Sequence, residues 1–137
     1  MMKKVILIAA ILATILLTLT QCNKDKICTA DFRSVTLTLK YSDEQPVLLD
    51  SLTVFWESEN RYIRQESISW EGVPPNGDYL IVDDGMQKEL EGEKETMRFT
   101  GFLDDKVIFK KDILVGADQC HVKYLGKESL VQTINKQ

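Results

Sequence analysis

Apolar and polar residues alternate along the segment 32–41. Val35 and Leu37 fall on one side of an extended chain, and threonines fall on the other. A period of two residues with many β-branched side chains is typical of a strand with one buried face. The segment 52–56 repeats the pattern, with Trp56 on its apolar side. Both segments are therefore predicted to be strands that cover a core.

Short apolar segments separated by turn residues continue to the end of the chain. Further strands are expected at 62–70, 78–82, 96–103, 106–109, 113–115, 120–125 and 129–134. Asp104-Asp105 indicates a tight hairpin turn, and the charged segment 86–95 is a loop or one helical turn. These short segments, without a long helix, predict an all-β, antiparallel two-sheet sandwich of seven or eight strands, with an immunoglobulin-like strand order open as an alternative.

The start of the chain has a different pattern. Lys3 and Lys4 precede an uncharged apolar run from Val5 to Leu19. At about 15 residues this run is shorter than the roughly 20 that cross a bilayer as a helix. A basic segment followed by such a run is typical of an export signal. We therefore predict a signal peptide over residues 1–21, which is removed after export.

The residues Leu-Thr-Gln-Cys at 19–22 resemble a bacterial lipobox. Gln21 stands where a small residue is usual, a departure that Bacteroidetes-type lipoproteins tolerate. The resemblance implies palmitate and other acyl chains on Cys22, which hold a protein stably at a membrane, and a lipidated tether over 22–27. Asn-Lys-Asp-Lys at 23–26 is similar to a surface-sorting tag, so the expected place is the outer membrane, on its periplasmic face or at the cell surface. The alternative is an ordinary thiol at Cys22 beside a conventional cleavage site.

With Cys22 lipidated, two cysteines remain, Cys28 and Cys120, in a compartment that favours oxidation. We expect a disulfide between them. The bond would close a loop of about 92 residues, for which chain entropy allows roughly 4–5 kcal/mol. Residues 28–137 then form a single domain of ordinary size.

Charge and composition exclude several partners. The net charge is −4, and it falls to about −6 once Lys3 and Lys4 are removed with the signal peptide. Without a basic stripe, nucleic acid is not an expected partner. One histidine and two paired cysteines are too few for zinc, and the aspartates near turns lack the spacing of a calcium loop. We predict neither a metal nor a cofactor.

Two segments carry a family resemblance: Ile-Cys-Thr-Ala-Asp-Phe-Arg at 27–33 and Val-Gly-Ala-Asp-Gln-Cys-His-Val at 115–122. Gly-Asp-Tyr at 77–79 and Asp-Asp at 83–84 add to these two segments. Together they make the chain similar to small Bacteroidetes-type lipoproteins with a transthyretin-like, or carboxypeptidase-regulatory-like, β-sandwich. The resemblance implies the same cysteine pairing and supplies no activity. The hydroxyisourate hydrolases of this fold need several histidines and a Tyr-Arg-Gly-Ser end, whereas this chain has one histidine and ends Ile-Asn-Lys-Gln.

The candidate catalytic groups are few. His121 adjoins Cys120, but neighbouring strand residues point to opposite faces, so we expect a partly exposed histidine beside a disulfide and no catalytic site. A hydrolase would instead need two carboxylates in one cleft, for which Asp83, Asp84 and Asp118 are the candidates.

Two aromatic residues are the candidate ligand contacts. Phe55 falls on the polar side of its strand, where a ring is unusual unless the second sheet or a loop covers it, and Trp70 adjoins a loop rich in glycine and proline. The expected function is that of a non-catalytic, lipid-anchored binding or accessory module in a surface assembly, with a protein or glycan partner. An envelope hydrolase and a structural spacer are the alternatives.

Overall fold

The computed structural model describes residues 27–68 and 76–136. The predicted signal peptide and Cys22 lie outside these residues. Two short helical elements, η1 (Asp84–Met86) and α2 (Gln87–Leu90), occupy part of the charged segment for which a loop or one helical turn was predicted. The strands are β1 (Ser34–Tyr41), β2 (Ser51–Trp56), β3 (Arg61–Ser67), β4 (Asp78–Asp83), β5 (Glu95–Leu103), β6 (Lys106–Ala117), β7 (Val122–Tyr124) and β8 (Val131–Ile134).

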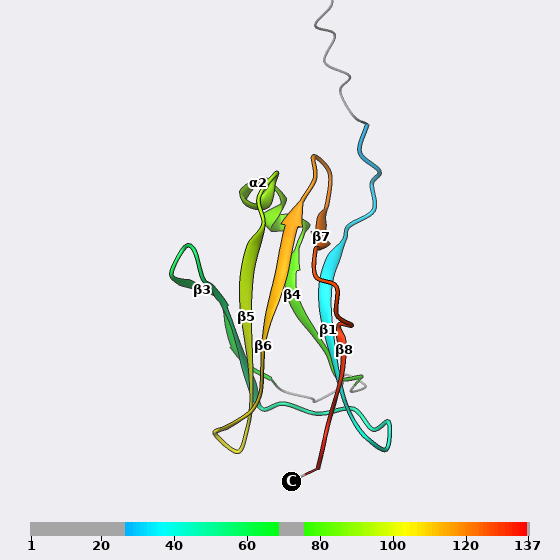
Figure 1. The fold of residues 1–137 in the computed structure, drawn as a ribbon, viewed down its shortest axis with the longest axis vertical. Helices are drawn as coiled ribbons and strands as arrows, with labels where there is room; N and C mark the ends of the chain where they lie inside the picture. Colours follow the sequence, from blue (N-terminus) through cyan, green and yellow to red (C-terminus); the bar gives the residue numbers. More distant parts are fainter. Residues whose placement is uncertain (1–26, 69–75, 137) are drawn as a thin grey trace, which may run out of the picture.

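The strands form two facing sheets (Figure 1). One has three strands in the order β4-β1-β8, and the other has five in the order β3-β2-β5-β6-β7. This confirms the predicted all-β sandwich. One pairing differs from the antiparallel expectation, because β8 runs parallel to β1. After β7 the chain leaves the five-stranded sheet and crosses to the three-stranded one without a hairpin. β8 therefore lies beside β1 and runs in the same direction as β1.

The core lies between the sheets and is filled by the alternating apolar positions. Leu37 of β1 and Val54 of β2 are fully buried, and Trp56 is 3% exposed, as its apolar side predicts. Tyr79 of β4 is also buried. Its hydroxyl donates to the carbonyl of Val47 at 2.5 Å and accepts from the backbone N–H of Leu49 at 3.0 Å. Burial raises the pKa of Tyr79 to about 12. The hydroxyl of this buried tyrosine therefore has hydrogen-bond partners within the core.

The β5–β6 hairpin confirms the predicted turn. Asp104 and Asp105 have φ values of 50° and 58°, the left-handed region that a two-residue hairpin turn of type I′ requires. The strands predicted at 106–109 and 113–115 are a single strand, β6, because the polar residues between them continue the ladder, and two of these residues, Lys111 and Asp112, form ion pairs. Gly101 faces Phe109 and Phe102 faces Val107, which leaves Ile108 as the extra residue of a bulge.

Candidate functional site

The sandwich has two distinct ends, and a candidate site lies at each of them. Residues 27–33 enter at the end where α2 lies, which we call the tether end (Figure 1). The C-terminus leaves at the opposite end, which we call the distal end.

At the tether end, Cys28 and Cys120 form a disulfide with Cα atoms 5.3 Å apart. The bond joins the segment that precedes β1 to the loop that precedes β7. The pairing expected from cysteine number and compartment is therefore present. A disulfide sulfur carries no thiolate, so neither residue offers a nucleophile in this oxidised form.

His121 is buried, which corrects the expectation of partial exposure. It is 9% exposed, because side chains distant in sequence cover it. Its Nδ1 lies 2.7 Å from Oδ2 of Asp84, and its Nε2 lies 3.1 Å from the hydroxyl of Thr29. An ionised carboxylate only accepts, so Nδ1 carries the proton and, in the neutral ring, Nε2 accepts from Thr29. The imidazole thus links η1 to the segment that enters the domain.

Asp84 accepts hydrogen bonds from three groups in two distant parts of the chain. Besides His121, the backbone N–H groups of Arg33 and Val122 each donate to it at 2.8 Å. Partial burial opposes ionisation of Asp84, but the hydrogen bonds from His121, Arg33 and Val122 outweigh it, and the pKa of Asp84 lies below its usual range. The carboxylate is therefore an ionised acceptor that holds the tether end together.

Asp118 organises the loop that carries the disulfide. Its Oδ1 accepts from the backbone N–H groups of Cys120 and His121, both at 2.9 Å, and its Oδ2 lies 3.0 Å from Nζ of Lys123. The two backbone hydrogen bonds, followed by the one from Lys123, hold the pKa of Asp118 well below its usual range. Asp118 is thus a loop-forming acceptor.

The three carboxylates proposed for acid–base chemistry are engaged in local structure. Asp83 accepts from the backbone N–H of Gly85 at 2.9 Å and caps η1. Acid–base catalysis by two carboxylates needs pKa values that are pushed apart, whereas those of Asp84 and Asp118 are both lowered. Within residues 27–68 and 76–136, no three histidine, cysteine or carboxylate groups gather in a way that could hold a metal ion.

Thr29, His121 and Asp84 nevertheless line up in the order hydroxyl, imidazole, carboxylate. This order of groups is the one that activates a hydroxyl for acyl transfer. Thr29 as a residue is exposed, and its contact with His121 is partly buried. Sequence reasoning missed this arrangement, since the three residues come from three separate segments.

Phe55 lies on the outer face of the five-stranded sheet, because its neighbours Val54 and Trp56 both point into the core. The second sheet therefore does not cover it. Its ring packs edge-on against Tyr62 of β3 with centroids 4.9 Å apart, and Tyr62 itself is 58% exposed. Trp70, the other predicted contact, lies outside the described residues. The ring found beside Phe55 is thus Tyr62. Tyr62 begins the predicted strand 62–70, but the sequence did not single it out as a ligand contact.

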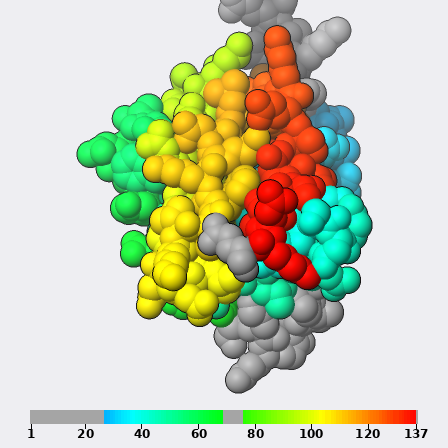
Figure 2. Space-filling view, turned by 60° about the horizontal axis from the view of Figure 1, so that its bottom comes forward, coloured from blue at the N-terminus to red at the C-terminus, as the bar shows by residue number. Residues whose placement is uncertain are grey.

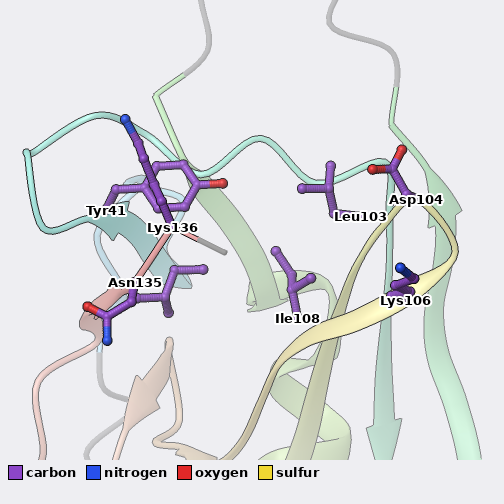
Figure 3. A pocket seen from close by; sticks show the side chains of 8 residues that line it. Tyr41, Leu103, Asp104, Lys106, Ile108, Asn135 and Lys136 are labelled. Carbon is purple, nitrogen blue, oxygen red and sulfur yellow. The ribbon is translucent and has the colours of Figure 1, made fainter.

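The distal end holds a cleft of about 610 Å³ between the β5–β6 hairpin and the C-terminal segment. Figure 2 brings this end forward, with the hairpin in yellow beside the red C-terminal residues. Eight residues line the cleft: Tyr41, Leu103, Asp104, Lys106, Ile108, Ile134, Asn135 and Lys136. Figure 3 shows that Leu103 and Ile108 lie between two polar ends, one with Asp104 and Lys106 and the other with Lys136 over Tyr41.

The polar end beside Tyr41 is ordered by side-chain contacts. Nζ of Lys136 lies 2.5 Å from Oδ2 of Asp43 and 5.3 Å from the centroid of the Tyr41 ring. No sequence motif predicts this cleft, because its residues come from three segments that are distant in the chain and meet only in the folded sandwich.

Comparison with known proteins finds no matching family model, no matching curated protein and no matching solved structure. Among the residues that the structure describes, no helix is long and apolar enough to span a membrane.

Proposed function

We propose that this chain is a non-catalytic, lipid-anchored envelope protein that acts as a binding or accessory module for a surface assembly. Its binding site is the distal cleft. The observation that carries the proposal is the cleft's construction, with apolar residues Leu103, Ile108 and Ile134 between polar ends. Its volume of about 610 Å³ falls within the roughly 300–1,000 Å³ that is usual for small-ligand sites.

The position of the cleft suits a protein held at its N-terminus. Cys22, the predicted lipid attachment site, precedes Cys28 by only six positions. The disulfide, the contact of Thr29 with His121 and the hydrogen bond from Arg33 to Asp84 hold residues 28–33 against the tether end. A membrane anchor at Cys22 would therefore leave the opposite end, with the cleft, free to meet a partner. The transthyretin-like relationship and the outer-membrane location remain predictions and are part of this proposal.

Methyl NMR of the full chain in lipid nanodiscs tests the binding site. Ile, Leu and Val methyl groups are labelled, and the probes are glucose and N-acetylglucosamine hexasaccharides and short neutral peptides that end in leucine or phenylalanine amide. We expect at least one probe to shift the methyl resonances of Ile108 and Ile134. The resonances of Ile81 and Ile113, which are fully buried in the core, serve as internal references.

A pair of neighbouring substitutions provides the matched control. Ile108→Ala removes a cleft contact and is expected to weaken probe binding about tenfold, the effect of roughly 1.4 kcal/mol. Val107→Ala changes the adjacent residue, which is 56% exposed and lines no part of the cleft, and is expected to leave affinity unchanged. Equal effects of the two substitutions, or shifts confined to other surfaces, would refute the cleft as the site. No shift with any probe would favour the spacer alternative.

A second candidate function rests on the alignment of Thr29, His121 and Asp84. In an esterase reaction the Thr29 oxygen would attack the ester carbonyl while its proton passes to Nε2 of His121. The alcohol would leave with that proton, and water would then release the acid from Thr29. An alkyl fluorophosphonate tests this reaction, because it adds a phosphonyl group to an activated hydroxyl. Mass spectrometry that finds Thr29 labelled in the full chain, and no label in Thr29→Val, would support an enzyme over a binding module.

A further inference from the structure

We propose that the distal cleft binds an extended, acidic segment of a partner polypeptide, which joins the five-stranded sheet as an added strand on the free edge of β6. This inference rests on the proposed function, because it names the occupant of the same cleft. Three features carry it: an unpaired length of backbone, an apolar floor beside that backbone, and unpaired positive charge along it.

The unpaired backbone belongs to β6. On the side away from β5, β7 pairs only with Val115–Ala117, and the N–H of Leu125 adds one hydrogen bond to the carbonyl of Leu114. In the part of the chain that the structure describes, nothing pairs with residues 106–113 on that side. The chain crosses this edge near Lys111, so residues 106–110 remain open. At about 3.4 Å per residue they offer roughly 17 Å of edge, enough to pair with about five residues of a longer peptide. Such an edge is a template for another strand.

The second wall of the cleft is also an edge. β8 ends the three-stranded sheet, and among the described strands it pairs only with β1, so none of these strands bridges the gap between β6 and β8 on this side of the sandwich. The residues that follow β6 cross this gap near Lys111, which contacts Glu128. Below that crossing lies the cleft, which is lined by residues of the β5–β6 hairpin and of the C-terminal segment. A strand laid on β6 would therefore face the C-terminal segment across the cleft.

The floor of the cleft selects for apolar side chains at alternate positions. The bulge in β6 leaves Ile108 without an opposite residue in β5, and Ile108 lines the cleft beside Leu103. Bulges redirect side chains in this way. Ile134 lines the opposite wall. In an added strand every second side chain would meet this floor, as in other complexes formed by strand addition.

The charge along the edge selects for acidic side chains. Lys106 and Lys110 are exposed, and neither forms an ion pair with any residue in 27–68 or 76–136. Lys111 and Lys136, by contrast, are paired with Glu128 and Asp43. Acidic residues of a partner strand would supply the missing counter-charges. A second copy of β6 is disfavoured, because it would bring lysines against lysines, which is how edge strands avoid self-association.

The test uses an acetylated, amidated octapeptide, Glu-Val-Glu-Ile-Glu-Val-Glu-Ile, titrated into the full chain in lipid nanodiscs. We expect methyl shifts at Leu103, Ile108 and Ile134. A peptide with N-methyl groups on alternate residues keeps the charge and side chains but blocks one hydrogen-bonding edge, and it is expected to bind at least tenfold more weakly. A peptide with lysine in place of each glutamate is expected not to bind.

Charge variants of the protein supply the matched pair. Lys106→Glu with Lys110→Glu is expected to weaken binding of the acidic peptide at least tenfold and to permit binding of the lysine peptide. Lys88→Glu with Lys94→Glu makes the same charge change at exposed positions of the tether end and is expected to have less than a twofold effect at 150 mM salt, because screening is strong over that separation.

The outcomes separate this inference from the function it rests on. If the sugar or neutral peptide probes shift Ile108 and Ile134 while the acidic peptide does not, the cleft is a binding site and strand addition is wrong. Equal binding of the N-methylated peptide also overturns strand addition. Peptide shifts confined to the outer face around Phe55 would overturn both the occupant and its site.

Discussion

The imidazole of His121 and the carboxylate of Asp84 lie 2.7 Å apart although 37 positions separate them in the chain. With Thr29 and the disulfide, this contact fastens the entering segment to the sandwich. In a tethered protein, a pull on the anchor would reach the domain through these same residues. The stability of the tether end is therefore a functional property of the proposed module.

Asp84→Asn is expected to destabilise the protein, because an amide has one acceptor oxygen where the carboxylate uses two. Asp84 accepts from His121, Arg33 and Val122 through those two oxygens. We expect the thermal unfolding midpoint to fall by roughly 4–8 °C. Asp105→Asn, at an exposed turn position with φ 58° that asparagine adopts readily, is the control. Differential scanning calorimetry that finds equal midpoints for the two variants would contradict the role of Asp84.

Acid is expected to weaken the fold through Asp84 and Asp118. The pKa values of both lie below the usual range in the folded protein. The unfolded chain, with aspartate pKa values of about 3.9, therefore takes up protons at a higher pH than the folded one. Their contribution to stability is full above about pH 5 and is lost as the pH falls through 4 toward the folded pKa values.

Urea unfolding between pH 7 and pH 2 measures this dependence. In Asp118→Asn the fall in the free energy of unfolding below pH 5 should be smaller than in the unchanged protein. An identical pH profile in the variant would show that the hydrogen bonds to Asp118 do not favour its ionised form in the folded state.

Reduction of the Cys28–Cys120 disulfide is expected to lower the free energy of unfolding by about 2–5 kcal/mol, because a loop of 92 residues is no longer closed in the unfolded chain. The double variant Cys28→Ala, Cys120→Ala should match the reduced protein and show no further response to reductant. A reduced protein as stable as the oxidised one would mean that the hydrogen bonds of Thr29 and Arg33 alone hold the entering segment.

Tyr79→Phe is expected to cost about 1–3 kcal/mol of unfolding free energy, because it removes both hydrogen bonds that the buried hydroxyl makes to Val47 and Leu49. Tyr62→Phe removes the same atom from a residue that is 58% exposed and should change stability by less than about 0.5 kcal/mol. Chemical denaturation of both variants decides the point. Similar losses would show that the Tyr79 hydroxyl is not a special feature of the core.

The alternation of side chains predicted most of the secondary structure because it is a local property. Val35, Leu37 and Trp56 point inward where the period of two places them, and the Asp104-Asp105 turn follows from backbone preferences of adjacent residues. The same local reasoning split β6 into two strands, since polar residues in its middle resemble a break unless their ion pairs are known.

The sequence alone determined most of the strands, the hairpin turn and, through cysteine number and expected compartment, the Cys28–Cys120 pairing. Only the tertiary structure decided that His121 is buried against Asp84, that β8 runs parallel to β1, and that the β6 edge opens onto a cleft. Each of these depends on which distant strands pair and in what direction. The periodicity of a segment indicates only which of its side chains face the core. Contacts between distant strands depend instead on how all the segments are arranged around that core.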